Sequence, residues 1–160
     1  LGSDGIAPFL AKKDKGIFVL VKTSNPSGGE LQDMKLENGL TVYERMAQLT
    51  DEWGRDSIGK SGYSDVGAVV GATYPKQAAA LRAMLPHTFF LVPGYGAQGG
   101  GADGAVAGFD EKGGGGIVNS SRGIICAYKQ EKYKGMKFDE AAYAACVDMR
   151  EDLVAALARR

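Results

Sequence analysis

Four short apolar runs, each followed by a segment with a helical pattern, constrain the fold of this chain more than any other feature. The runs are rich in β-branched and aromatic residues and cover 16–23 (GIFVLVKT), 66–72 (VGAVVGA), 88–93 (TFFLVP) and 115–120 (GGIVNS). Nearly continuous apolar runs of this length are typical of strands buried on both faces of a parallel sheet. The sequence therefore predicts four parallel strands that are adjacent and in sequence order.

Helical patterns separate these runs. They cover 41–58, 76–85, 102–109 and 138–157, and a further helix is predicted at 3–10 with Ser3 or Asp4 as its N-cap. Strands that alternate with helices indicate βα units, in which outer helices cover a parallel sheet. Two α/β folds fit this order: a doubly wound open sheet, and half of an eight-stranded βα barrel.

Charge and cysteine content exclude several classes of function. The chain carries 19 basic and 19 acidic side chains, whereas surfaces for nucleic acids or anionic membranes require a basic excess. Cys126 and Cys146 are too few for a disulfide framework and, with a single histidine, for a zinc site. We interpret both as packing residues and expect a reducing, cytoplasmic location. No apolar run reaches the roughly 18 residues that a membrane-spanning helix needs.

The chain shows no internal boundary, so we expect residues 1–160 to form one domain. It begins at Leu1 rather than at a methionine, which suggests that it is part of a longer protein. The charged segment 129–137 (KQEKYKGMK) is interpreted as a solvated connection.

The segments that follow the last two apolar runs carry the chemistry expected of an anion site. Ligands of βα folds gather beyond the carboxyl ends of the strands, and the last two loops of a barrel often hold phosphate. The loop 94–101 is rich in glycine and offers Gln98 as a donor, and 120–123 supplies Arg122 and the backbone amides of Ser121 and Gly123. A surface salt bridge of Arg122 and a glycine loop without a ligand remain the alternatives.

Three other polar residues invite a functional interpretation but have simpler ones. Ser24 follows the first run within TSNPSGG, where serine is commonly a turn former. His87 lies before its strand, at the end away from the ligand face, and is interpreted as structural. Lys22 lies within the first strand and is the one internal candidate for a catalytic amine, but no carboxylate partner is visible beside it in the sequence.

Four segments make the sequence recognisable. The chain resembles the orotidine 5′-phosphate decarboxylase family, in the branch with the TSNP and PGYGAQGG forms, over 18–33, 67–75, 89–100 and 117–129. The resemblance covers essentially the whole chain. It implies a TIM (β/α)8 barrel of which residues 1–160 are the C-terminal half, strands five to eight, as a single partial domain. It also implies conversion of orotidine 5′-phosphate to UMP and carbon dioxide without a cofactor or metal.

The resemblance also assigns roles to residues. Ser24 matches the serine that contacts the pyrimidine, Gln98 the loop glutamine that bridges phosphate and base, and Arg122 the phosphate arginine. Ser121 and Gly123 flank that arginine and are expected to bind the substrate too. The partner is then a small molecule, not a nucleic acid or a membrane, and the full-length enzyme is expected to be a homodimer.

The family's catalytic Lys/Asp motif, of the form D-x-K-x-x-D, does not occur in this sequence. We therefore expect the catalytic residues upstream, and we expect this chain alone to be inactive. Two alternatives remain open: another phosphate-binding barrel, such as a sugar-phosphate synthase or epimerase, and a non-catalytic phosphate-binding half-barrel.

Overall fold

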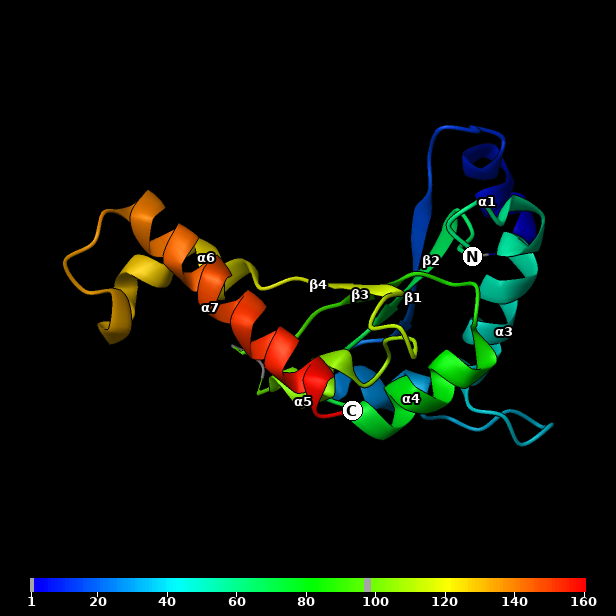
Figure 1. Cartoon of the computed structure of the whole chain (residues 1–160). Helices are drawn as coiled ribbons and strands as arrows, with labels where there is room; N and C mark the ends of the chain where they lie inside the picture. Colours follow the sequence, from blue (N-terminus) through cyan, green and yellow to red (C-terminus); the bar gives the residue numbers. More distant parts are fainter. Residues whose placement is uncertain (1, 97–98) are drawn as a thin grey trace.

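Four parallel strands form the centre of the fold (Figure 1). The computed structural model describes residues 2–96 and 99–160. The strands are β1 (Ile17–Lys22), β2 (Val66–Val70), β3 (Phe90–Val92) and β4 (Gly116–Val118). They pair in the order β1-β2-β3-β4, each parallel to the next. This confirms the predicted adjacency, although every strand is shorter than its apolar run, β3 and β4 most of all.

One helix, α1 (Ser3–Leu10), precedes β1, and at least one helix follows each strand. The others are α2 (Gly29–Gln32), α3 (Val42–Gly54), α4 (Pro75–Met84), α5 (Ala102–Val106), α6 (Ser121–Ile125) and α7 (Phe138–Ala158). Short 3-10 turns cover η1 (Pro26–Gly28), η2 (Arg55–Ser57), η3 (Ala127–Lys129) and η4 (Glu131–Tyr133). None of the helices in the described ranges combines the length and the apolar character that crossing a bilayer requires.

Local sequence explains where these helices begin. Thr41 and Glu44 form a reciprocal capping box at the start of α3, and Pro75 occupies the first turn of α4. The predicted cap of α1 was wrong. Its N-cap is Gly2, whose carbonyl oxygen already accepts from the amides of Gly5 and Ile6. The helix therefore starts before Ser3 can cap it.

The main core lies between one face of the sheet and helices α3, α4, α5 and α7. Strand residues of this face are Val21, Ala68, Val70, Phe90 and Val92, all buried. They pack with Ala47 of α3, Leu81 of α4 and Ala156 of α7, among others. A second cluster joins the other half of α7 to the segment 127–133, where Tyr133 is buried. The charged segment 129–137 is therefore not wholly solvated.

The opposite face of the sheet is apolar but largely exposed. Register aligns Leu20, Val69, Leu91 and Ile117 across the four strands, and Phe18 beside Gly67. Phe18, Leu20 and Ile117 are 47%, 63% and 53% exposed. We call Phe18, Leu20, Leu91 and Ile117 the open face. Burial on both faces is thus confirmed for β2, whose five residues are all buried, but not for β1 and β4.

Candidate functional site

The carboxyl ends of β1 and β3 meet through Ser24. Its side chain is buried, and its hydroxyl donates a 2.9 Å hydrogen bond to the carbonyl oxygen of Pro93. Strand β2 lies between these two strands, and Gly71 at its end leaves room for the contact. A Cβ on Gly71 would lie 2.1 Å from Ser24 Oγ. Ser24 therefore occupies a fixed position that depends on the glycine beside it.

The loop after β3 folds back on itself. The amide of Gly96 donates to the carbonyl of Gly100 at 2.8 Å, and the amide of Gly100 donates to the carbonyl of Gly94 at 3.1 Å. Gly94 and Gly96 adopt φ values of 95° and 73°, a region that side chains rarely enter. Gln98, predicted from the sequence to bind the substrate, lies outside the residues that the structure describes.

A cavity of about 150 Å³, here called the small pocket, separates this loop from the loop after β4. Its walls are Pro93, Gly94, Tyr95, Asn119, Ser120, Ser121 and Arg122. The structure thus brings the predicted residues Ser121 and Arg122 together with the glycine loop. Ser24 reaches the same wall through its hydrogen bond to Pro93.

The side chain of Arg122 is exposed. Across 2–96 and 99–160 its guanidinium forms no ion pair with a carboxylate. The surface salt bridge considered for Arg122 is therefore not formed with any described residue. Gly123 does not line the small pocket. A Cβ added to Gly123 would come within 2.3 Å of Ser120 Oγ.

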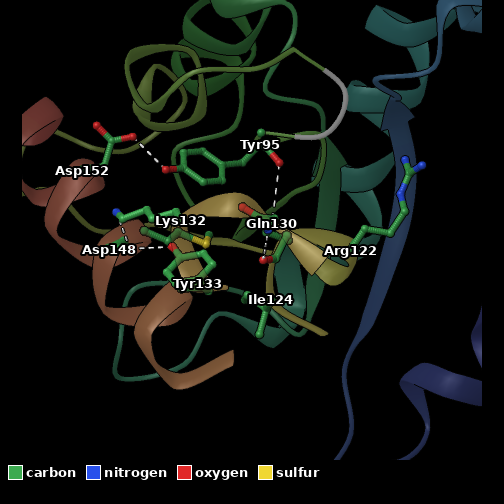
Figure 2. Close-up of a pocket in the computed structure, with 13 residues that line it drawn as sticks. Tyr95, Arg122, Ile124, Gln130, Lys132, Tyr133, Asp148 and Asp152 are labelled. Carbon is green, nitrogen blue, oxygen red and sulfur yellow. Dashed lines mark hydrogen bonds and ion pairs between the residues drawn. The ribbon is translucent and has the colours of Figure 1, made fainter. Parts of the chain in front are cut away.

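A larger cavity of about 550 Å³, here called the large pocket, lies between the loop after β3, α6, η4 and α7 (Figure 2). The hydroxyl of Tyr95 donates to Asp152 at 2.7 Å, and Asp148 accepts from Tyr133 and pairs with Lys132. Burial and the hydrogen bond to Asp152 raise the pKa of Tyr95 to about 12.

The large pocket contains residues that sequence reasoning missed. Asp148 and Asp152 are four residues apart on α7, a spacing that places both on one helix face and that could have drawn attention. Arg122 and Gly123 also line this pocket, but Figure 2 shows the Arg122 side chain pointing away from the tyrosines and carboxylates.

Lys22 has a carboxylate partner that the sequence did not reveal. Its Nζ atom lies 2.6 Å from Asp33 Oδ1, and the side chain is 1% exposed. Lys22 pairs in register with Val70, a residue of the helix-facing core, so its side chain lies on that side of the sheet. It lines neither of the two pockets, and an active-site role as a catalytic amine is not supported.

The remaining candidates for metal or redox chemistry are scattered. Within the described ranges, histidine, cysteine and acidic side chains do not gather in groups of three or more that could hold a metal ion. Cys126 is half-buried and Cys146 is exposed, both as free thiols, so the packing interpretation fails for Cys146. His87 contacts the carbonyl oxygen of Gly62 at 2.9 Å and is exposed ahead of β3.

Comparisons with known proteins agree on one family. The family model described as orotidine 5′-phosphate decarboxylase / HUMPS matches residues 1–135. The chain is 47% identical over 160 residues to the orotidine 5′-phosphate decarboxylase of Rhodopirellula baltica, covering 96% of this chain and 53% of that protein. It is 48% identical to the decarboxylase of Caldicellulosiruptor bescii, covering 98% of this chain and 52% of that one. The chain thus spans about half the length of the curated relatives that it matches.

Solved structures of other decarboxylases have a similar fold. The structure of Leishmania donovani OMP decarboxylase superposes with a TM-score of 0.69 at 32% identity, covering 96% of this chain and 54% of that one. The solved neighbours are TIM barrels. Of the two folds that fit the sequence, the half-barrel is therefore confirmed and the doubly wound open sheet is not.

Proposed function

This chain belongs to the orotidine 5′-phosphate decarboxylase / HUMPS family, and on that premise we propose that it is the C-terminal portion of a decarboxylase. The complete enzyme converts orotidine 5′-phosphate to UMP and carbon dioxide. This portion supplies strands five to eight of the barrel, the phosphate site and part of the pyrimidine site. The observation that carries the proposal is the small pocket, where Arg122 lies beside the glycine loop that follows β3.

The small pocket suits a phosphate group. A phosphate dianion needs a positive charge and several N–H donors, and arginine supplies both in a planar fork. Arg122 makes no competing ion pair with the described residues, so its guanidinium is available to a ligand. We assign the phosphate to Arg122 and the backbone amide of Ser121, which line the small pocket. The amide of Gly123, outside that lining, is assigned to the phosphate from the sequence alone. Gln98 is assigned to the contact between phosphate and base by resemblance.

Ser24 suits the pyrimidine ring. A hydroxyl offers one donor and two acceptor lone pairs, and the donor of Ser24 is already engaged by the carbonyl oxygen of Pro93. Its oxygen is therefore oriented to accept a hydrogen bond. The imide N–H of the pyrimidine is a donor of the required kind, and the bond to Pro93 places Ser24 next to the phosphate pocket.

The carbon chemistry is assigned to residues outside this sequence. Protonation of a pyrimidine carbon needs a positioned amine with its own carboxylates, and the family motif D-x-K-x-x-D is absent here. Lys22 is committed to Asp33 on the helix-facing side of the sheet. The 160-residue chain alone is therefore proposed to be inactive.

The open face supports a barrel that is completed by further strands. Phe18, Leu20 and Ile117 would point into the interior of a closed barrel, which side chains fill in layers. In the described part of the chain β1 and β4 each pair along one edge, and unpaired edges are a liability that closure removes. We propose that the missing strands cover this face and pair with both edges. The complete enzyme is also proposed to be a cytoplasmic homodimer.

The test is decarboxylation by the complete polypeptide. Its incubation with orotidine 5′-phosphate, followed by the change in pyrimidine absorbance, should show turnover, whereas the 160-residue chain should show none. Addition of the N-terminal half in trans should restore turnover to the chain. An inactive complete enzyme would refute the proposed function. Turnover by the chain alone would show that the catalytic centre has been misplaced.

A further inference from the structure

Lys22 is an unusual residue for the inside of this fold. It is among the largest of the fully buried side chains in the described residues, at 1% exposure. Its ammonium group lies 2.6 Å from Asp33 Oδ1, 4.6 Å from the centre of the Tyr74 ring and 5.2 Å from that of Tyr43. A buried ammonium group is costly even when it is paired, and an apolar side chain of similar volume often serves packing as well or better. We therefore expect the charge of Lys22 to have a role other than packing.

The ion pair anchors helix α2, which follows the loop that carries Ser24, to the end of β1. Asp33 is the C-cap of α2 and is 52% exposed, so the buried ammonium group holds the end of a short helix that has no buried residue of its own. An α-helix of four residues has little stability of its own. Its position depends on contacts of this kind.

Helix α2 in turn forms hydrogen bonds with Thr23, the residue that precedes Ser24. The Gln32 side chain accepts from the Thr23 amide at 3.1 Å and donates to the Thr23 hydroxyl at 2.9 Å. That hydroxyl donates to Asn25 Oδ1 at 2.6 Å. The two neighbours of Ser24 are thus tied to each other, and Thr23 is tied to α2.

We propose that Lys22 is a positioning residue: through Asp33 and α2 it fixes Thr23, and so sets the orientation of the Ser24 hydroxyl toward the pyrimidine. The proposal rests on the proposed function, because it assigns Lys22 a part in the same site. Lys22 itself does not touch the substrate. Its effect on the reaction passes through Ser24, and this sets it apart from a residue that only stabilises the fold.

A double-mutant cycle in the complete enzyme tests this. Lys22→Met removes the charge at similar volume, and Ser24→Ala removes the hydroxyl. If Lys22 acts through Ser24, each single change should lower kcat/KM for orotidine 5′-phosphate by about tenfold or more, since small misplacements in a site are costly. In the Ser24→Ala background, Lys22→Met should lower kcat/KM by less than about threefold, because the two effects are not additive.

The control is Lys15→Met. Lys15 also forms a 2.6 Å ion pair, with Asp14, but precedes β1 at its opposite end, and its loss should leave kcat/KM unchanged. If Lys22→Met fails to fold, Asp33→Asn breaks the same ion pair from its exposed side and takes its place in the cycle.

Two results would overturn the inference: full activity of the Lys22 or Asp33 variant, or an equal loss in the presence and absence of the Ser24 hydroxyl. Both require an active wild type. A complete wild-type enzyme without decarboxylase activity would instead count against the proposed function.

Discussion

The hydroxyl of Ser24 donates a 2.9 Å hydrogen bond to the carbonyl oxygen of Pro93, 69 residues further along the chain. This contact joins the ends of β1 and β3 across the end of β2. It brings the residue assigned to the pyrimidine beside the pocket assigned to phosphate. The geometry is possible because Gly71 has no side chain.

Gly71→Ala should therefore disturb the site without changing any residue that touches the substrate. The new Cβ would lie 2.1 Å from Ser24 Oγ and 2.8 Å from the Ser24 amide nitrogen, so Ser24 must move. We expect kcat/KM of the complete enzyme to fall by about 10²-fold, the order of loss that a displacement near 1 Å causes. Gly5→Ala is the matched control, since nothing lies within 4 Å of the Cβ that it adds. Equal activity of both variants would show that Ser24 tolerates displacement.

The sequence predicted the elements of the fold because their signals are local. Apolar runs and helical periods depend on neighbours a few residues apart, and Pro75 and Thr41 mark helix starts directly. The lengths of β3 and β4 were overestimated, because only residues that find a partner on the adjacent strand enter the ladder.

The walls of the small pocket were predictable where barrel topology alone determines them. Arg122 and the glycine loop follow neighbouring strands, so their ends had to meet. The partners of Lys22 and Tyr95 were not predictable. Asp33 reaches Lys22 only after the chain turns through α2, and Asp152 reaches Tyr95 only through the packing of α7. Such contacts leave no pattern in the local sequence.

Leu20→Glu should distinguish a covered face from an exposed one. Leu20 is 63% exposed in this half of the barrel, but in a closed barrel it would face the interior. Burial of an unpaired carboxylate there should lower the unfolding free energy of the complete protein by about 3 kcal/mol or more.

The control for this change is Leu31→Glu, because Leu31 on α2 is exposed to the same 63% but lies outside the open face. Urea unfolding of both variants provides the comparison. An equal, small loss for both would mean that no further strands cover the open face.

The carboxylate of Asp110 should make stability depend on pH. Hydrogen bonds from the Tyr63 hydroxyl and the amides of Gly114 and Lys112 hold the pKa of Asp110 below its ordinary value. A depressed folded-state pKa contributes stability above the unfolded value of about 4, and this stability is lost as pH falls through the folded value.

Asp110→Asn should therefore destabilise the protein more at about pH 7 than at about pH 3, as measured by urea unfolding at each pH. Tyr63→Phe removes the largest cause of the shift, so the stability that this variant loses on acidification should be smaller than in the wild type, and the loss should be complete at a higher pH. A destabilisation by Asp110→Asn that is the same at both pH values would contradict this account.

The central proposal is that this chain binds the phosphate of the substrate through Arg122. The comparison needed is kcat/KM of the complete enzyme for orotidine 5′-phosphate and for the phosphate-free nucleoside orotidine, in the wild type and in Arg122→Ala. Arg150→Ala is the control, since Arg150 is exposed on α7 and lines neither pocket.

We predict that Arg122→Ala costs about 2–5 kcal/mol of transition-state stabilisation on the nucleotide, the range for removal of one partner of a buried hydrogen-bonded charge pair, because bound substrate would cover the contact between Arg122 and the phosphate. On the nucleoside it should change kcat/KM by less than about threefold, because no phosphate is there to be held. An equal loss on the two substrates would show that Arg122 does not act through the phosphate and would contradict the account.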